Sequence, residues 1–220
     1  MTTAAVHTGA RVAGRALAVT LGLVAAVTHG KPLHAKGRTH RAVLRIDAPV
    51  VGSGVRLLSE RGQHDCIARM SRAMSTPEGF WDIGGFALRV ESAGPGCEPA
   101  DLLFASTGTG RIGRHLLRMT RHPMSEPMTT LLPLRAGTRS LLLLVQPLDP
   151  RARQVELSVG LDGGAWSRVG IIEVGPEMRG ASPRFDPLVR QLEGTVAPPW
   201  VTAIREPAYR TARRLGRRTH

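Results

Sequence analysis

Short apolar segments, each closed by turn-forming residues, follow one another through the middle of the chain, and this pattern restricts the fold more than any other feature. Residues 66–71 alternate between two faces, with Arg69 on one face and Ala68 and Met70 on the other, which is the period of a half-buried strand. Clusters of Gly, Pro and Asp separate such segments. The pattern predicts strands over residues 40–46, 66–71, 85–90, 101–106, 128–134, 140–146, 154–160 and 167–174.

Two groups of strands with no long helices alternating between them favour an antiparallel barrel over a doubly wound α/β sheet. We therefore expect a mainly β protein with peripheral helices (α+β), in which an eight-stranded antiparallel β-barrel is flanked by N- and C-terminal helices. The expected helices after the fourth strand are residues 114–121, 187–193 and 200–214. The expected domains are an N-terminal helical segment (1–30), the barrel (31–180) and a C-terminal helical tail (181–220).

The N-terminal part contains an apolar run over residues 16–27, preceded by Arg11 and Arg15. Such a run is too short to span a bilayer, although its flanks are typical of the apolar core of a signal peptide. We expect it to lie as a helix on the domain of a cytoplasmic protein. Export, or membrane association through residues 11–27, is the alternative.

The strongly basic composition restricts the possible partners. A net charge of +13 and a pI near 11.5 would suit nucleic acid or an anionic membrane. However, the arginines are spread along the whole chain, Lys31 and Lys36 are the only lysines, and no zinc-finger, helix-turn-helix or RNP pattern occurs. The glycine-rich residues 107–113 lack the Gly-Lys-Ser/Thr ending of a phosphate loop and are predicted to form a turn. We expect no specific nucleic-acid partner.

Two cysteines, Cys66 and Cys97, do not form a disulfide framework and fit a reducing compartment. Apart from His34, which is considered next, the histidines show no ligand spacing and are expected at the surface.

Several short motifs occur in the order in which haem-dependent catalases have them, and together they resemble that superfamily. The chain is similar to a much shortened member, of the kind called a catalase-related peroxidase. The resemblance implies a catalase-like barrel that binds haem b. The motifs are His34-Ala-Lys-Gly37, Arg69-Met-Ser71, Asp82-Ile-Gly-Gly-Phe-Ala-Leu-Arg89, Asp101-Leu-Leu103, Phe185-Asp-Pro187 and Arg205-Glu-Pro-Ala-Tyr209.

The resemblance also implies roles on the two sides of the haem. Tyr209 would ligate the ferric iron through its phenolate, and Arg205 would lower the pKa of that phenol by placing a positive charge beside it. His34 would take a proton from bound peroxide and return it to the departing oxygen. Ser71 would hold the His34 ring in orientation. Ser106 stands where the family has a distal asparagine and is a shorter hydrogen-bond donor.

The remaining cofactor contacts implied by the resemblance are ionic, with Lys31, Arg69 and Arg214 facing the haem propionates. Loss of the distal amide implies weak dismutation of hydrogen peroxide and a preference for peroxidase turnover on small or organic hydroperoxides. Two other interpretations stay open. One is a haem-free barrel with a binding or hydrolase role of the phosphodiesterase type, and the other is a basic peripheral membrane protein.

Overall fold

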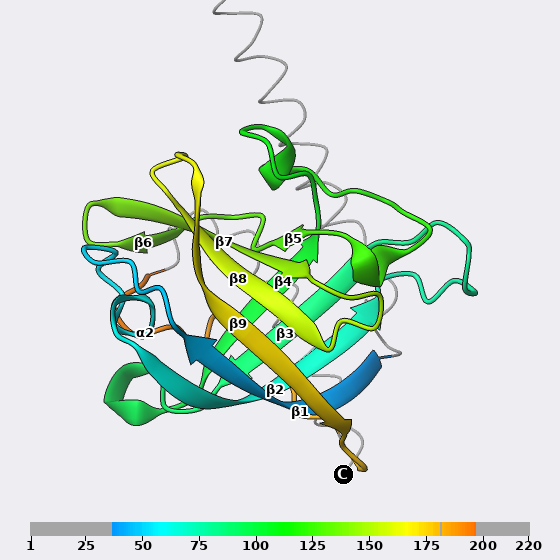
Figure 1. Cartoon of the computed structure of the whole chain (residues 1–220), viewed down its shortest axis with the longest axis horizontal. Coiled ribbons are helices and arrows are strands. Elements are labelled where there is room, and N and C mark those ends of the chain that lie inside the picture. Colours follow the sequence, from blue (N-terminus) through cyan, green and yellow to red (C-terminus); the bar gives the residue numbers. More distant parts are fainter. Residues whose placement is uncertain (1–36, 181, 197–220) are drawn as a thin grey trace, which may run out of the picture.

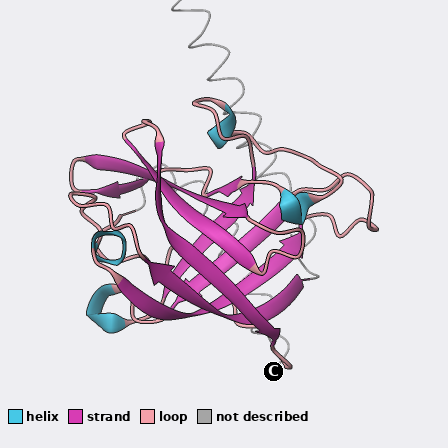
Figure 2. Ribbon diagram, viewed as in Figure 1, coloured by secondary structure: helices cyan, strands magenta, loops and turns pink. Residues whose placement is uncertain are grey.

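The computed structural model describes residues 37–180 and 182–196. Within these residues nearly all regular structure is β (Figures 1 and 2). The helices are short: α2 (Arg56–Ser59) and the 3₁₀ turns η1 (Pro95–Cys97), η2 (Gly113–His115) and η3 (Pro123–Ser125). The strands are β1 (Gly37–Ile46), β2 (Gly62–Arg72), β3 (Gly84–Val90), β4 (Ala100–Ser106), β5 (Met128–Thr129), β6 (Leu134–Ala136), β7 (Arg139–Pro147), β8 (Gln154–Leu161) and β9 (Trp166–Glu177).

The strands form one antiparallel sheet that closes on itself. Their order is β5-β4-β3-β2-β1-β9-β8-β7-β6, and an additional pairing between β5 and β7 joins the two ends. All strands except β6 therefore lie in the closed barrel, while β6 extends it as a hairpin partner of β7. The prediction of an eight-stranded antiparallel barrel is confirmed.

Side chains fill the interior of the barrel. Each strand points alternate residues inward, so that Leu44 of β1, Leu88 of β3, Leu143 of β7 and Leu157 of β8 are completely buried in one apolar cluster. A barrel of this strand number has an interior just wide enough for side chains to fill. A cofactor as large as a porphyrin would therefore have to lie outside this packed interior.

The segment after β9 runs back across the barrel. The backbone amide of Asp186 donates to the carboxylate of Asp101 in β4 at 2.7 Å. Farther along, Val196 pairs with Arg135 of β6 through two backbone hydrogen bonds. This segment is held mainly by polar contacts, with Leu192 adding an apolar one to the core.

Several predicted elements are corrected by the structure. Residues 114–121 form no helix beyond the single turn of η2, because Leu117 and Thr120 pair as β-bridges with Thr107 and Asp82. Residues 187–193 contain only a hydrogen-bonded turn. The predicted strand over residues 128–134 ends at Thr129, since Leu131 adopts a positive φ of 61° that no strand allows. The N-terminal helical segment (1–30) and the helix over residues 200–214 lie outside the described residues.

Among the residues whose structure is described, no helix has both the length and the apolar character needed to cross a membrane.

Candidate active site

A strip of small residues crosses the outer face of the barrel where β1 begins. Gly37 of β1 lies opposite Ser71 of β2, Ser71 lies opposite Gly85 of β3, and Gly85 lies opposite Ala105 of β4. Alternation along β2 places Ser71 on the face opposite to Met70, which packs against the core. We call these four residues the outer strip. All four side chains are small; Ser71 and Gly85 are buried, and Ala105 packs against Leu131 and Leu132.

Arg69 lies on the same outer face, one position along from the strip. It pairs with Thr39 of β1 and with Ala87 of β3. A Cβ atom at Gly37 would lie 2.9 Å from Cζ of Arg69 and 2.9 Å from Cβ of Ser71, so only glycine allows this close approach. Burial lowers the pKa of Arg69. A guanidinium that is partly removed from water attracts a carboxylate more strongly than a fully hydrated one.

The hydroxyl of Ser71 is positioned by β3. Ser71 is 7% exposed, and its Oγ donates to the carbonyl oxygen of Gly85 at 3.4 Å. A serine hydroxyl that donates in one direction is also able to accept from a second group. The register therefore places a hydroxyl acceptor beside Gly37, the first residue of β1 and the last of the His34-Ala-Lys-Gly37 motif.

Ser106 has a structural role in this arrangement. It is completely buried, its Oγ donates to the carbonyl oxygen of Arg118 at 2.8 Å, and it accepts from the amide of Gly84 at 2.9 Å. The single hydroxyl proton is thus engaged within the fold. The role expected for Ser106, a donor to bound peroxide, would require the hydrogen bond to Arg118 to break.

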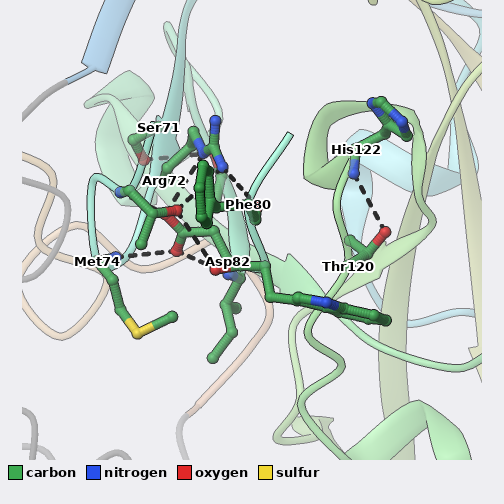
Figure 3. A network of polar contacts seen from close by, with 12 residues as sticks. Ser71, Arg72, Met74, Phe80, Asp82, Thr120 and His122 are labelled. Carbon is green, nitrogen blue, oxygen red and sulfur yellow. Dashed lines mark hydrogen bonds and ion pairs between the residues drawn. The ribbon is translucent and has the colours of Figure 1, made fainter. Parts of the chain in front are cut away.

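Asp82 organises the loop that follows β2 (Figure 3). Its buried carboxylate accepts from the amides of Met74, Thr76 and Ile83 at 2.8–3.0 Å, and from the Thr76 hydroxyl at 2.9 Å. Arg72 adds an ion pair at 3.4 Å. Burial alone would raise the pKa of Asp82, but these hydrogen bonds outweigh it and the net shift is downward. Asp82 therefore holds the loop rigidly as a carboxylate.

Three of the motifs that suggested the family resemblance meet at a second buried ion pair. The Arg89 guanidinium donates two hydrogen bonds to Asp101, at 2.7 and 2.9 Å. Hydrogen bonding to Asp101 is the main reason why the pKa of Arg89 is raised. Arg89 also donates to the carbonyl oxygen of Arg184 at 2.6 Å and stacks over the Phe185 ring. These motif residues fasten the 182–196 segment to the barrel.

A cavity of about 800 Å³ opens at the end of the barrel where β1 starts. Its described walls come from the start of β1, the end of β2, the loop held by Asp82, and the turn between β7 and β8. The loop after β2 protrudes from the barrel in Figure 1. The polar wall includes Arg38, His40, Glu78 and Arg151, and Ser71 reaches its edge.

Sequence reasoning missed this cavity because its residues lie far apart in the chain and meet only through barrel closure. His40 was expected at the surface, but it is half-buried, with Nδ1 3.1 Å from the carbonyl oxygen of Gly175. His115 is also half-buried, with Nδ1 2.8 Å from the carbonyl oxygen of Leu131. The only local signal was the position of His40 in the first predicted strand, on the same face as its core residues.

The structure brings together only some of the predicted site residues. Arg69 and Ser71 lie side by side on the outer face, whereas the hydroxyl of Ser106 is used in a hydrogen bond to the backbone of Arg118. Within residues 37–180 and 182–196 no group of His, Cys, Asp and Glu side chains is arranged to hold a metal ion. The other predicted site residues lie outside the described residues: Lys31, His34, Arg205, Tyr209 and Arg214.

Comparisons with known proteins give a likeness in structure alone. No family model matches the sequence, and no curated protein matches it. Among solved structures, catalase A from Saccharomyces cerevisiae is similar with a TM-score of 0.57 and 10% identity, over 79% of this chain and 58% of that one. A fungal catalase is similar with the same TM-score and identity, over 79% of this chain and 57% of that one. The chain thus covers less than two thirds of either catalase, and what it shares with them is a catalase-like fold.

Proposed function

We propose that this chain is a catalase-related haem protein that acts on peroxides, as a peroxidase or weak catalase. The observation that carries the proposal is the register of β1 on β2. It places Gly37 opposite Ser71 and next to Arg69 on one outer face. The chain therefore enters the barrel beside two of the described residues that the resemblance assigns to a haem site. The catalase-like fold supports the same assignment.

In this proposal, haem would lie on the outer face of the barrel and not inside it. The interior is filled by side chains, with Leu44, Leu88 and Leu157 fully buried. On the outside, a planar ring would lie over the small side chains at the start of the strip, Gly37, Ser71 and Gly85. Arg69 lies at the side of the strip and supplies a partly desolvated cation for a propionate.

In the proposed reaction, bound haem would supply the iron at which the peroxide O–O bond is cleaved. His34 would accept the proton of the peroxide and return it to the departing oxygen. Ser71 would accept a hydrogen bond from the imidazole N–H, which fixes the nitrogen that stays available for the substrate. Tyr209 and Arg205 would hold the cofactor from the C-terminal side, while Lys31, Arg69 and Arg214 would bind its propionates.

The proposed activity is mainly that of a peroxidase. The hydroxyl of Ser106 donates to Arg118, so Ser106 is a poor replacement for an amide that donates to peroxide. Catalase turnover requires two peroxide molecules to be positioned one after the other. The loss of one hydrogen-bond donor to the substrate should therefore lower the catalase rate more than the peroxidase rate. Small or organic hydroperoxides with a separate reducing substrate are therefore the proposed substrates.

The second candidate is a haem-free barrel that binds a small molecule, and the cavity of about 800 Å³ favours it. A hydrolase of the phosphodiesterase type has less support from the described residues. Two of their buried carboxylates, Asp82 and Asp101, are held by arginines and by hydrogen bonds from nearby groups, and the third, Asp186, accepts from the amides of Leu188 and Val189. A carboxylate held in this way is poorly suited to general acid–base catalysis.

The test is the visible spectrum of the chain expressed with haem available. We expect the Soret band of a tyrosinate-ligated ferric haem, which Tyr209→Phe abolishes or shifts. His34→Ala should keep the band and lower peroxide turnover about 100-fold or more, because it removes the proton-transfer group. His122→Ala, at an exposed histidine, is the matched control and should change neither reading. If the wild-type protein shows no Soret band, the haem proposal is wrong and the haem-free barrel is the remaining candidate.

A further inference from the structure

We propose that the cavity at the β1 end of the barrel binds a small organic anion that carries an apolar part. The cavity lies between the start of β1, the end of β2, the loop held by Asp82 and the β7–β8 turn. Its volume of about 800 Å³ falls within the range of about 300–1,000 Å³ that is typical of small-molecule sites. This inference rests on the cavity and does not depend on haem binding.

The charge of the lining favours an anion. Arg38 from β1 and Arg151 from the β7–β8 turn approach the cavity from different elements, and neither guanidinium has an ion-pair partner among the described residues. Arg72 also lines the cavity, but it is paired with Asp82. Glu78 is the only acidic residue in the described lining. The two arginines therefore outweigh the one carboxylate at the opening.

His40 adds a polar atom with an unmet hydrogen bond. Its Nδ1 donates to the carbonyl oxygen of Gly175 at 3.1 Å, so Nε2 is the nitrogen left for another group. Nε2 is shielded from solvent and has no hydrogen-bond partner within the described part of the chain. As an acceptor, Nε2 needs a donor such as a bridging water or a hydroxyl, and a carboxylate oxygen does not pair with it directly.

The remaining wall is apolar and adaptable. Met70 comes from the end of β2, Met124 from η3, and Pro150 from the β7–β8 turn. Methionine side chains are flexible and polarizable, so they fit an apolar group without demanding one shape. An inorganic anion alone would leave this wall and most of the volume without contacts. The combination of two arginines with a methionine wall fits a short-chain carboxylate or a comparable organic sulfonate or phosphate.

The experiment compares three probes by isothermal titration calorimetry of the full-length chain. Hexanoate carries both a charge and an apolar tail, acetate carries the charge alone, and 1-hexanol carries the tail alone. We expect hexanoate to bind about ten-fold or more tightly than either of the others, because only hexanoate engages both parts of the lining. Equal affinity for acetate and hexanoate, or for hexanol and hexanoate, would overturn the inference.

Charge variants test the location of the site. Arg38→Gln and Arg151→Gln should each weaken hexanoate binding about two- to five-fold, the contribution of one partly exposed ion pair. Glu78→Gln should strengthen binding by a similar factor, since it removes the negative charge of the lining. Arg61→Gln removes one exposed arginine that precedes β2, at the end of that strand remote from Arg72, and is the matched control.

Weaker binding by the two arginine variants together with tighter binding by Glu78→Gln would show that hexanoate binds in this cavity. Unfolding could not produce this result, because it would weaken hexanoate binding in all three variants. No effect in any of the three, or an equal effect of Arg61→Gln, would place hexanoate elsewhere and refute the inference. The result is separable from the haem proposal. If hexanoate does not bind, the result of the Soret test is still valid. If the protein is colourless, the titration with hexanoate still tests the cavity.

Discussion

The carboxylate of Asp82 shows how much of the barrel end depends on a single buried group. It is completely buried and accepts hydrogen bonds from the backbone of Met74, Thr76 and Ile83 (Figure 3). The loop that it holds contributes to the cavity wall. At the scale of the residue, one wall of the cavity is therefore kept in place by a group that does not itself line the cavity.

We predict that Asp82→Asn lowers the free energy of unfolding by about 2–3 kcal/mol at pH 7, because an amide nitrogen would then face backbone N–H donors. The pKa of Asp82 is lowered in the folded state, so its stabilisation is present above the unfolded value of about 3.9 and is lost as the pH falls below it. Urea denaturation should therefore show a smaller difference between variant and wild type at pH 3 than at pH 7.

Asp65→Asn changes an exposed carboxylate in β2 and is the control for this comparison. It should lower the stability by less than about 0.5 kcal/mol. If Asp82→Asn cost no more than Asp65→Asn at pH 7, the hydrogen-bonded loop would not depend on the charge of Asp82.

At the scale of the element, the contact between β1 and β9 joins the two halves of the sheet, β1–β5 and β6–β9. Gly170 of β9 lies opposite Ile46 of β1 on one side and opposite Leu157 of β8 on the other. A Cβ atom at Gly170 would lie 2.0 Å from the carbonyl oxygen of Arg45, which is backbone and has no room to move aside. Glycine is thus required here by the approach of a neighbouring strand.

Gly170→Ala should therefore lower the free energy of unfolding by about 3 kcal/mol or more, the upper part of the range for overpacked sites. Gly110→Ala is the control, since a Cβ atom at Gly110 would meet nothing within 4 Å. Thermal denaturation followed by circular dichroism measures both. Equal melting temperatures for the two variants would show that β1 and β9 separate more easily at this point than the structure indicates.

At the scale of the whole molecule, the two thiols report whether the barrel opens as one unit. Cys66 points into the barrel core from β2 and is 4% exposed, whereas Cys97 lies exposed in η1. Burial raises the pKa of Cys66 to about 12. Since the thiolate is the reactive form, the Cys66 thiol should be inert as long as the core stays closed.

We predict that 5,5′-dithiobis(2-nitrobenzoate) at pH 8 modifies Cys97 rapidly, and modifies Cys66 only at the rate at which the barrel unfolds. Adding urea should accelerate the slow phase alone. Cys97→Ser should remove the fast phase and leave the slow one. Two fast phases in the wild-type protein would mean that β2 opens locally, without unfolding of the barrel.

The sequence alone determined the local elements well. Alternation with a period of two identified most strands of the closed barrel, since the pattern in residues such as Ala68 and Met70 depends only on immediate neighbours. The same local reasoning failed for residues 114–121. These residues were expected to form a helix, but isolated bridges from Leu117 to Thr107 and from Thr120 to Asp82 hold them in extended structure.

Where the predicted site residues lie could be read from the sequence only for those that belong to paired strands. Arg69 and Ser71 share a face because they are two apart in β2, which the sequence states directly. The roles of His34 and Tyr209 stay predictions, since these residues lie outside the described residues. Ser106 could not be judged from sequence, because its hydroxyl turns to Arg118, a partner that folding alone brings near.

What the sequence by itself determined is thus where strands form and which residues each strand turns outward, because both follow from the backbone geometry of a few consecutive residues. Only the tertiary structure decided that Arg38 and Arg151 line one cavity with His40, and that Asp82 holds its rim. Those meetings follow from the pairing of β5 with β7, which closes the sheet and brings distant turns to one end. Closure depends on the packing of the whole core, and no short stretch of sequence encodes it.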